Sequence, residues 1–221
     1  NWNGSSWTEV ADLTSSRNGG GGVGTPSSAL AFGGGGPVAK TESWNGTSWT
    51  ETTDLNTARS DFPGGSGVDN TSAICAGGYG TANVANVETW NGSSWTEVSD
   101  LNVAKRGLGS ARQTSTSTIV FGGYGTAALA TAESWDGTSW TEVGDMSATR
   151  NQIGGAGSDN TSAIAFGGDT STSTEEWTGA GADIGAWSTG TSINSVRYGG
   201  GASGIYTAAL LAGGINDTAK V

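Results

Sequence analysis

Tryptophan is the side chain in this sequence best suited to contact another molecule, because it recurs in pairs at a fixed spacing. Four pairs are separated by five positions: Trp2 and Trp7, Trp44 and Trp49, Trp90 and Trp95, and Trp135 and Trp140. A four-residue connection between two strands would make the members of each pair cross-strand neighbours. The indoles then either stack on each other and on neighbouring units, or leave one ring of each pair partly open to stack on a sugar ring.

In the second case the ligand-binding indoles are Trp7, Trp49, Trp95, Trp140 and Trp187. Trp187 follows Trp177 after a longer connection, residues 178–186, which interrupts an otherwise uniform pattern. Such a departure is either neutral drift or the mark of a contact surface.

Basic residues recur with the same regularity. Five cations each stand four residues after an apolar residue: Arg17, Arg59, Lys105 (or Arg106 beside it), Arg150 and Arg197. A glutamate also recurs two residues before the first tryptophan of a pair, as Glu42, Glu88, Glu133 and Glu175. The cations either collect an anion on one face, or pair with the glutamates and turn carbonyls and hold neighbouring repeats together. The shared period favours pairing.

The side chain that catalysis and metal binding use most often is missing. Histidine is absent, which removes the commonest general base and the commonest transition-metal ligand. The repeated aspartates Asp12, Asp54, Asp100 and Asp145 fit turns, because isolated carboxylates do not supply the six to eight oxygens of a calcium site. The single cysteine, Cys75, fits a small packing position. We therefore expect no enzyme activity, no cofactor and no metal.

Net charge and hydropathy limit the classes of partner that we expect. Nine basic and twenty acidic residues give a net charge of −11, which repels phosphate backbones, so nucleic acid is not an expected partner. No apolar run approaches the roughly 20 residues of a membrane helix, so no membrane insertion is expected. We expect a soluble segment, and it lacks an initiator Met.

A repeat organises all of these residues. Glycine pairs follow one another 44, 45, 45 and 46 residues apart: Gly33-Gly34, Gly77-Gly78, Gly122-Gly123, Gly167-Gly168 and Gly213-Gly214. A period of about 45 residues with alternating apolar segments is typical of a four-stranded propeller blade. The sequence predicts an all-β, five-bladed β-propeller of antiparallel blades, formed by residues 1–221 as one domain. The blades are expected at about 17–54, 59–101, 105–146, 150–192 and 197–221, the last completed by 1–12.

The second repeat shows the expected strands. A glycine-rich strand at 64–68 is followed by a turn at Asp69-Asn70 and an apolar strand at 73–76. A third strand at 84–90 and a fourth at 95–98 are joined by an Asn-Gly turn. Glycine suits the first strand, because innermost strands crowd around the central axis.

The two ends of the chain are expected to share one blade. The N-terminal residues supply the end of a third strand and a fourth strand, and the C-terminal residues supply the preceding strands, which would close the ring and remove exposed sheet edges. One glutamate of the pattern is missing between Val221 and Asn1, which suggests a piece of a longer repetitive protein.

The repeat resembles the kelch repeat. The resemblance is carried by Ala163-Ile164-Ala165-Phe166-Gly167-Gly168 and by the Trp-Asn-Gly-Ser-Ser-Trp words, and it covers essentially the whole chain. It differs from the usual kelch pattern in having Trp where the third strand commonly shows Tyr. The near-identical Ser/Thr/Gly-rich repeats are also similar in style to kelch-like segments of viral structural proteins, especially those of marine phages. This resemblance implies a virion or extracellular location.

These observations predict a non-enzymatic binding module. Uniform repeats favour several equivalent weak sites, and multivalent binding gains avidity of about 10²–10⁴-fold. The partner would be a glycan or a protein receptor. The alternative is a purely structural or protein-docking propeller of a larger assembly, in which all the tryptophans are buried.

Overall fold

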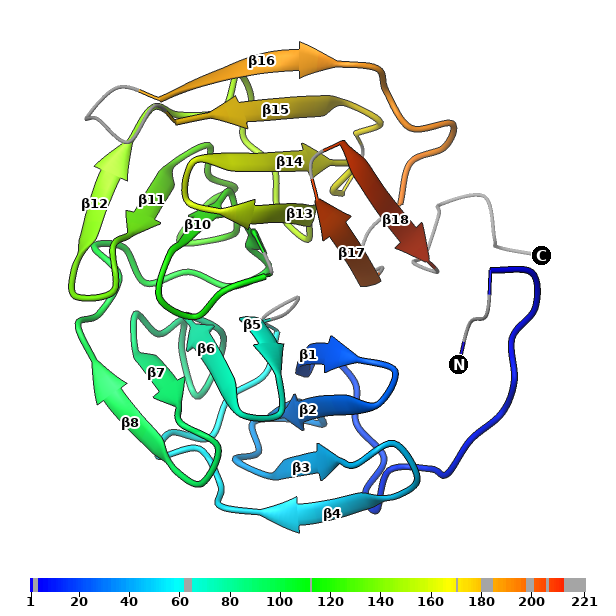
Figure 1. Ribbon diagram of the computed structural model, residues 1–221. Coiled ribbons are helices and arrows are strands. Elements are labelled where there is room, and N and C mark those ends of the chain that lie inside the picture. The colour runs from blue at the N-terminus through cyan, green and yellow to red at the C-terminus, as the bar shows by residue number, and fades with distance from the viewer. Residues whose placement is uncertain are drawn as a thin grey trace.

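The chain folds as a β-propeller in a computed structural model that describes residues 1, 4–61, 65–111, 113–169, 171–179, 185–197, 201–205 and 207–212 (Figure 1). Within these residues it forms eighteen strands and no helix, so the expected all-β class is confirmed. No described element could serve as a membrane-spanning helix.

Four antiparallel sheets of four strands are arranged around a central axis (Figure 1). Blade 1 contains β1 (Gly21–Thr25), β2 (Ser28–Phe32), β3 (Thr41–Trp44) and β4 (Trp49–Thr52); blade 2 contains β5 (Ser66–Asp69), β6 (Ser72–Ala76), β7 (Val87–Trp90) and β8 (Trp95–Val98). Blade 3 contains β9 (Gly109–Ser110), β10 (Thr118–Phe121), β11 (Ala132–Trp135) and β12 (Trp140–Val143); blade 4 contains β13 (Gly154–Asp159), β14 (Ser162–Phe166), β15 (Thr174–Thr178) and β16 (Ala186–Gly190). The first strand of each blade lies nearest the axis.

A fifth sheet differs from the expected blade. It has two strands, β17 (Gly201–Ile205) and β18 (Ala208–Ala212), and β17 packs beside β13 of blade 4. We call it the terminal sheet. The structure therefore shows four four-stranded blades and a two-stranded sheet within its described residues. The rest of the expected fifth blade includes residues 213–221, which lie outside the described residues. Trp2 and the last glycine pair also lie outside them.

The strands of blade 2 lie close to their expected positions, with one correction. The third strand begins at Val87, not at residue 84. The reason is hydrogen bonding, because the carbonyls of Val84 and Ala85 accept from the backbone N–H groups of Lys105 and Leu101 in the next connection. Those carbonyls tie blade 2 to the chain that follows it and are not used in a ladder.

Inner strands approach one another closely, which explains their glycines. A Cβ atom on Gly155 in β13 would lie 2.6 Å from the carbonyl oxygen of Ser110 in β9. Contact at that distance forbids a side chain, so glycine is required where neighbouring blades converge on the axis.

The apolar core lies between adjacent blades. Leu30 and Phe32 of blade 1 form one cluster with Trp90 and Trp95 of blade 2. Similar clusters join the next blades, and each mixes residues of two sheets. Burial of these clusters, and not contacts within a single sheet, holds the blades in their order around the axis.

Candidate binding sites

Three of the four predicted tryptophan pairs are cross-strand neighbours, and the fourth is not tested because Trp2 lies outside the described residues. Trp44 lies opposite Trp49, and the two ring centroids are 5.4 Å apart. Trp90 and Trp95, and Trp135 and Trp140, repeat this arrangement at 5.5 and 5.2 Å. The irregular connection does not prevent the same pairing of Trp177 with Trp187.

The second indole of each pair differs widely in exposure. Trp95 and Trp140 are 5% and 7% exposed because the preceding blade covers them. Trp187 is half-buried and stacks edge-on against Phe121 of blade 3. Trp49 is half-buried, and Trp7 is 69% exposed. A ligand-binding role for Trp95 and Trp140 stays a prediction, and the structure gives it no open ring face.

The repeated cations pair with the repeated glutamates. Arg17 forms an ion pair with Glu42, and the distances are 2.6 Å for Arg59 to Glu88, 2.8 Å for Lys105 to Glu133 and 2.5 Å for Arg150 to Glu175. All eight side chains are buried. The pairing interpretation is therefore confirmed for these four cations. It also settles that Lys105, and not Arg106, occupies the repeated position in blade 3.

Each of these arginines also donates hydrogen bonds to backbone carbonyl groups. Arg59 donates to the carbonyls of Gly77 and Asn86 within its own blade, and its own carbonyl accepts from Gly34 of the preceding blade at 3.0 Å. Glu88 accepts in addition from the backbone N–H groups of Asn56 and Thr57. The repeated ion pair thus joins the connection between two blades to the blade that follows.

Arg197 stands apart from this set. It is half-buried, its Nε donates to Ser195 Oγ at 3.3 Å, and its carbonyl accepts from Gly168 of blade 4 at 3.1 Å. The backbone part of the repeated arrangement is therefore present at Arg197. Its predicted role in ligand binding remains a prediction.

The environment of these pairs shifts two pKa values. Burial alone would raise the pKa of Glu42, but hydrogen bonds from Thr14 and the neighbouring Arg17 guanidinium hold it below its ordinary value of 4.5. Burial lowers the pKa of Arg150, against the opposing charge of Glu175.

Asparagine clamps between blades are a feature that sequence reasoning missed. The side chain of Asn70 in blade 2 donates to Ser43 Oγ at 2.9 Å and to the Trp44 carbonyl at 3.1 Å, both in blade 1. Asn160 of blade 4 similarly donates to the Trp135 carbonyl of blade 3. The repeated Asp-Asn-Thr-Ser sequence is the feature that could have indicated these contacts, but by itself it predicts only a turn.

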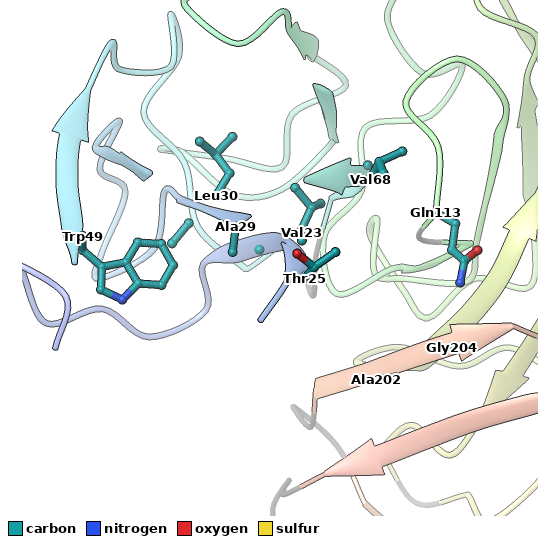
Figure 2. A pocket seen from close by; sticks show the side chains of 13 residues that line it. Val23, Thr25, Ala29, Leu30, Trp49, Val68, Gln113, Ala202 and Gly204 are labelled. Carbon is teal, nitrogen blue, oxygen red and sulfur yellow. The ribbon is translucent and has the colours of Figure 1, made fainter. Parts of the chain in front are cut away.

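A cavity of about 550 Å³ opens between blade 1 and the terminal sheet, and this too was not predicted. Figure 2 shows the Trp49 indole reaching toward Ala29, while Ala202 and Gly204 of β17 lie across the cavity from Val23 and Thr25. Gln113 and Val68 add a polar and an apolar side chain to the wall. Of the predicted ligand-binding indoles, Trp49 is the one that lines this cavity.

Two positions of the repeat differ at this seam among the described residues. Blade 1 has Pro26 at the turn position of Asn70, so it carries no amide to clamp the sheet before it. The position of Phe32 and Phe121, just before the glycine pair, is Ala212 in the terminal sheet. Those phenylalanines contact Trp95 and Trp187 edge-on. Alanine alone does not expose an indole, because blade 2 has Ala76 at this position and Trp140, in the same cluster, is buried.

Comparison with known proteins supports the fold. The solved structure of YjhT superimposes with a TM-score of 0.74 over 91% of this chain and 73% of that protein, at 13% sequence identity. At this identity the similarity concerns the propeller architecture alone. No protein-family model matches the sequence, and no curated protein matches it.

Proposed function

We propose that this chain is a non-enzymatic, kelch-like binding propeller that holds a glycan against Trp49 in the cavity between blade 1 and the terminal sheet. The half-buried indole in a cavity of about 550 Å³ is the observation that carries the proposal. Cavities of about 300–1,000 Å³ suit small ligands, and an indole face is a favoured platform for the apolar face of a sugar ring.

The rest of the wall fits the same class of ligand. Thr25 and Gln113 offer hydroxyl and amide groups for hydrogen bonds, and Val23 and Val68 offer apolar surface. The inner-strand residues Gly22 and Gly24 bring backbone close to the cavity. Because the equivalent indoles in blades 2 and 3 are covered, the proposal is one principal site, not several equivalent ones.

We also propose that the ring has five blades. Asn1 and Thr8 exchange two backbone hydrogen bonds, of 2.6 and 2.8 Å, like the third and fourth strands of the other blades. Figure 1 shows the N-terminal segment running from the neighbourhood of the terminal sheet to blade 1. In blade 1, Leu30 of the second strand pairs with Ser43 of the third strand. Leu210 and Asn1 occupy the corresponding positions, so in the same register the N-terminal hairpin would pair with β18 and place Asn1 opposite Leu210.

A glycan array with the whole chain tests the proposed ligand class. We expect selective binding that Trp49→Ala abolishes, while Trp7→Ala, which changes an exposed indole outside the cavity, leaves it unchanged. A folded chain that binds no glycan, or equal losses in the two variants, would contradict the proposal.

A structural or protein-docking propeller on a virion or an extracellular appendage is the second candidate. It is favoured by the burial of Trp95 and Trp140 and by the asparagine clamps, which serve blade packing. Acrylamide quenching separates the two candidates. Glycan binding predicts a quenchable indole fluorescence that the ligand protects, and a purely structural role predicts no ligand protection.

A further inference from the structure

A cation held between two aromatic rings lies on the loops of blades 2 and 3, away from the cavity. The guanidinium carbon of Arg106 is 4.7 Å from the ring centroid of Tyr79 and 5.5 Å from that of Tyr124. Its Nε atom lies 3.4 Å from Asp61 Oδ2. Arg106 also exchanges backbone hydrogen bonds of 3.1 and 2.7 Å with Tyr124, which fixes the base of the side chain.

The cluster breaks the repeat. The residue after the buried cation is Asn18, Ser60 or Asn151 in the other full blades and Arg106 only in blade 3. The residue after the glycine pair is Tyr79 in blade 2 and Tyr124 in blade 3, but Gly35 and Asp169 in the flanking blades. Uniform structural needs do not require a second cation here, because Lys105 already pairs with Glu133.

The outer edge of the Arg106 guanidinium is available for a further partner. The side chain is 34% exposed, and among the described residues its two terminal nitrogens make no hydrogen bond. The exposed Lys40, in contrast, pairs with Glu51 at 3.0 Å. Asp61 and the two rings orient the planar group, and its two terminal nitrogens are a pair of donors that can bind a carboxylate through two hydrogen bonds.

We propose that Tyr79, Arg106 and Tyr124 form a docking site for an acidic segment of a partner protein, which places a carboxylate on the outer edge of the guanidinium. Tyrosine and arginine are enriched among the residues that dominate protein interfaces, and this favours a protein partner. Because the chain carries a net charge of −11, an acidic ligand is attracted only close to the Arg106 guanidinium. The carboxylate of Asp61 beside it disfavours highly charged ligands. Weak, salt-sensitive binding to one or two carboxylates is expected.

Titration of the whole ¹⁵N-labelled chain with a capped peptide that carries two glutamates among glycines tests this site. We expect a saturable shift of the Arg106 Nε resonance, no shift with the matching peptide that carries two glutamines, and weakening of the binding as salt is added. Arg106→Lys, which keeps the charge but loses the planar pair of donors, should weaken the peptide affinity at least fivefold. Lys40→Ala is the matched control and should leave the affinity unchanged.

The outcomes distinguish docking from a structural role. If Arg106 only joins blades 2 and 3, Arg106→Gln lowers the melting temperature and leaves peptide binding intact, which would overturn the proposal. Equal weakening by Lys40→Ala would also overturn it, since it shows non-specific attraction. Binding of a uronate trisaccharide without binding of the peptide would assign the site to a sugar and refute the protein partner. Trp49→Ala should not change this binding, so the test is independent of the glycan proposal.

Discussion

The ring of Phe32 in blade 1 packs edge-on against the indole of Trp95 in blade 2, with centroids 4.9 Å apart and planes at 65°. The same relationship joins Phe121 of blade 3 to Trp187 of blade 4 at 5.0 Å. Edge-to-face contact of this kind contributes beyond simple burial. It helps to close these two seams, whereas the seam between blades 2 and 3 is closed by a cluster that contains Ala76 and Trp140.

Removing the covering ring should therefore destabilise the propeller. Phe32→Ala is expected to reduce the free energy of unfolding by about 3–5 kcal/mol, because it removes a fully buried ring and leaves a void beside Trp95. Trp49→Ala should cost much less, since Trp49 is only half-buried. Urea unfolding of both variants measures the difference, and equal costs would show that the seam at Trp49 is as closed as the seam at Trp95.

Lys105 makes fewer hydrogen bonds among the described residues than the arginines of the buried ion-pair set, and arginine should improve it. Arg150 donates to the carbonyls of Gly167 and Ser173 as well as to Glu175, whereas none of the described contacts joins the Lys105 ammonium to the corresponding carbonyls. Lys105→Arg would supply those donors, and charge-assisted hydrogen bonds are worth about 1.5–3 kcal/mol each at most. We expect the melting temperature to rise by roughly 2–4 °C for each kcal/mol gained.

The reciprocal change is the control for that experiment. Arg59→Lys removes the donors to Gly77 and Asn86 and should lower the melting temperature. If Lys105→Arg lowers the melting temperature instead, the site in blade 3 is too small for a guanidinium.

Much of the fold could be predicted, because the repeat places like residues in like positions. The pairing of Trp90 with Trp95 follows from their spacing and from the Asn-Gly turn between them. Exposure could not be predicted in the same way, because Trp49 and Trp95 stand in almost the same local sequence. What differs is the neighbouring sheet, which presents Phe32 to Trp95 and has alanine at the matching position before Trp49. That residue does not decide exposure alone, since Trp140 is buried although blade 2 has Ala76 at the same position, so the packing of the whole neighbouring sheet is needed.

Asn70 shows a second limit. An Asp-Asn-Thr-Ser sequence forms a turn whether or not the asparagine amide reaches another blade, so its contact with Trp44 depends on packing that local sequence does not contain. The same reasoning applies to Arg106. Its sequence position next to Lys105 left the repeated cation ambiguous, and only the contact of Lys105 with Glu133 separates the two roles.

Acid should weaken the fold partly through Glu42. Its pKa in the folded chain is below its ordinary value of 4.5, so its contribution to stability is present above that value and is lost as the pH falls through the lower, folded pKa. Glu42→Gln should therefore reduce the loss of stability below pH 4.5. Denaturant unfolding between neutral pH and pH 3 measures this slope, and an unchanged slope in the variant would exclude Glu42 as a contributor.

Cys75 should be chemically inert in the folded chain. It is fully buried, and burial raises the pKa of its thiol to about 11. At pH 8 the thiol is protonated and covered, so we expect no reaction with a thiol reagent until denaturant is added. Rapid labelling without denaturant would mean that the core between blades 1 and 2 opens readily.

The binding of a sugar beside Trp49 is the central claim, and indole N–H resonances test it most directly. The oligosaccharide that gives the strongest array signal would be titrated into the whole ¹⁵N-labelled chain while the tryptophan Nε1–H signals are followed. We expect a saturable shift of the Trp49 signal and little change in the signals of the covered Trp95 and Trp140. Shifts at Trp95 or Trp140 with an unmoved Trp49 signal would contradict it.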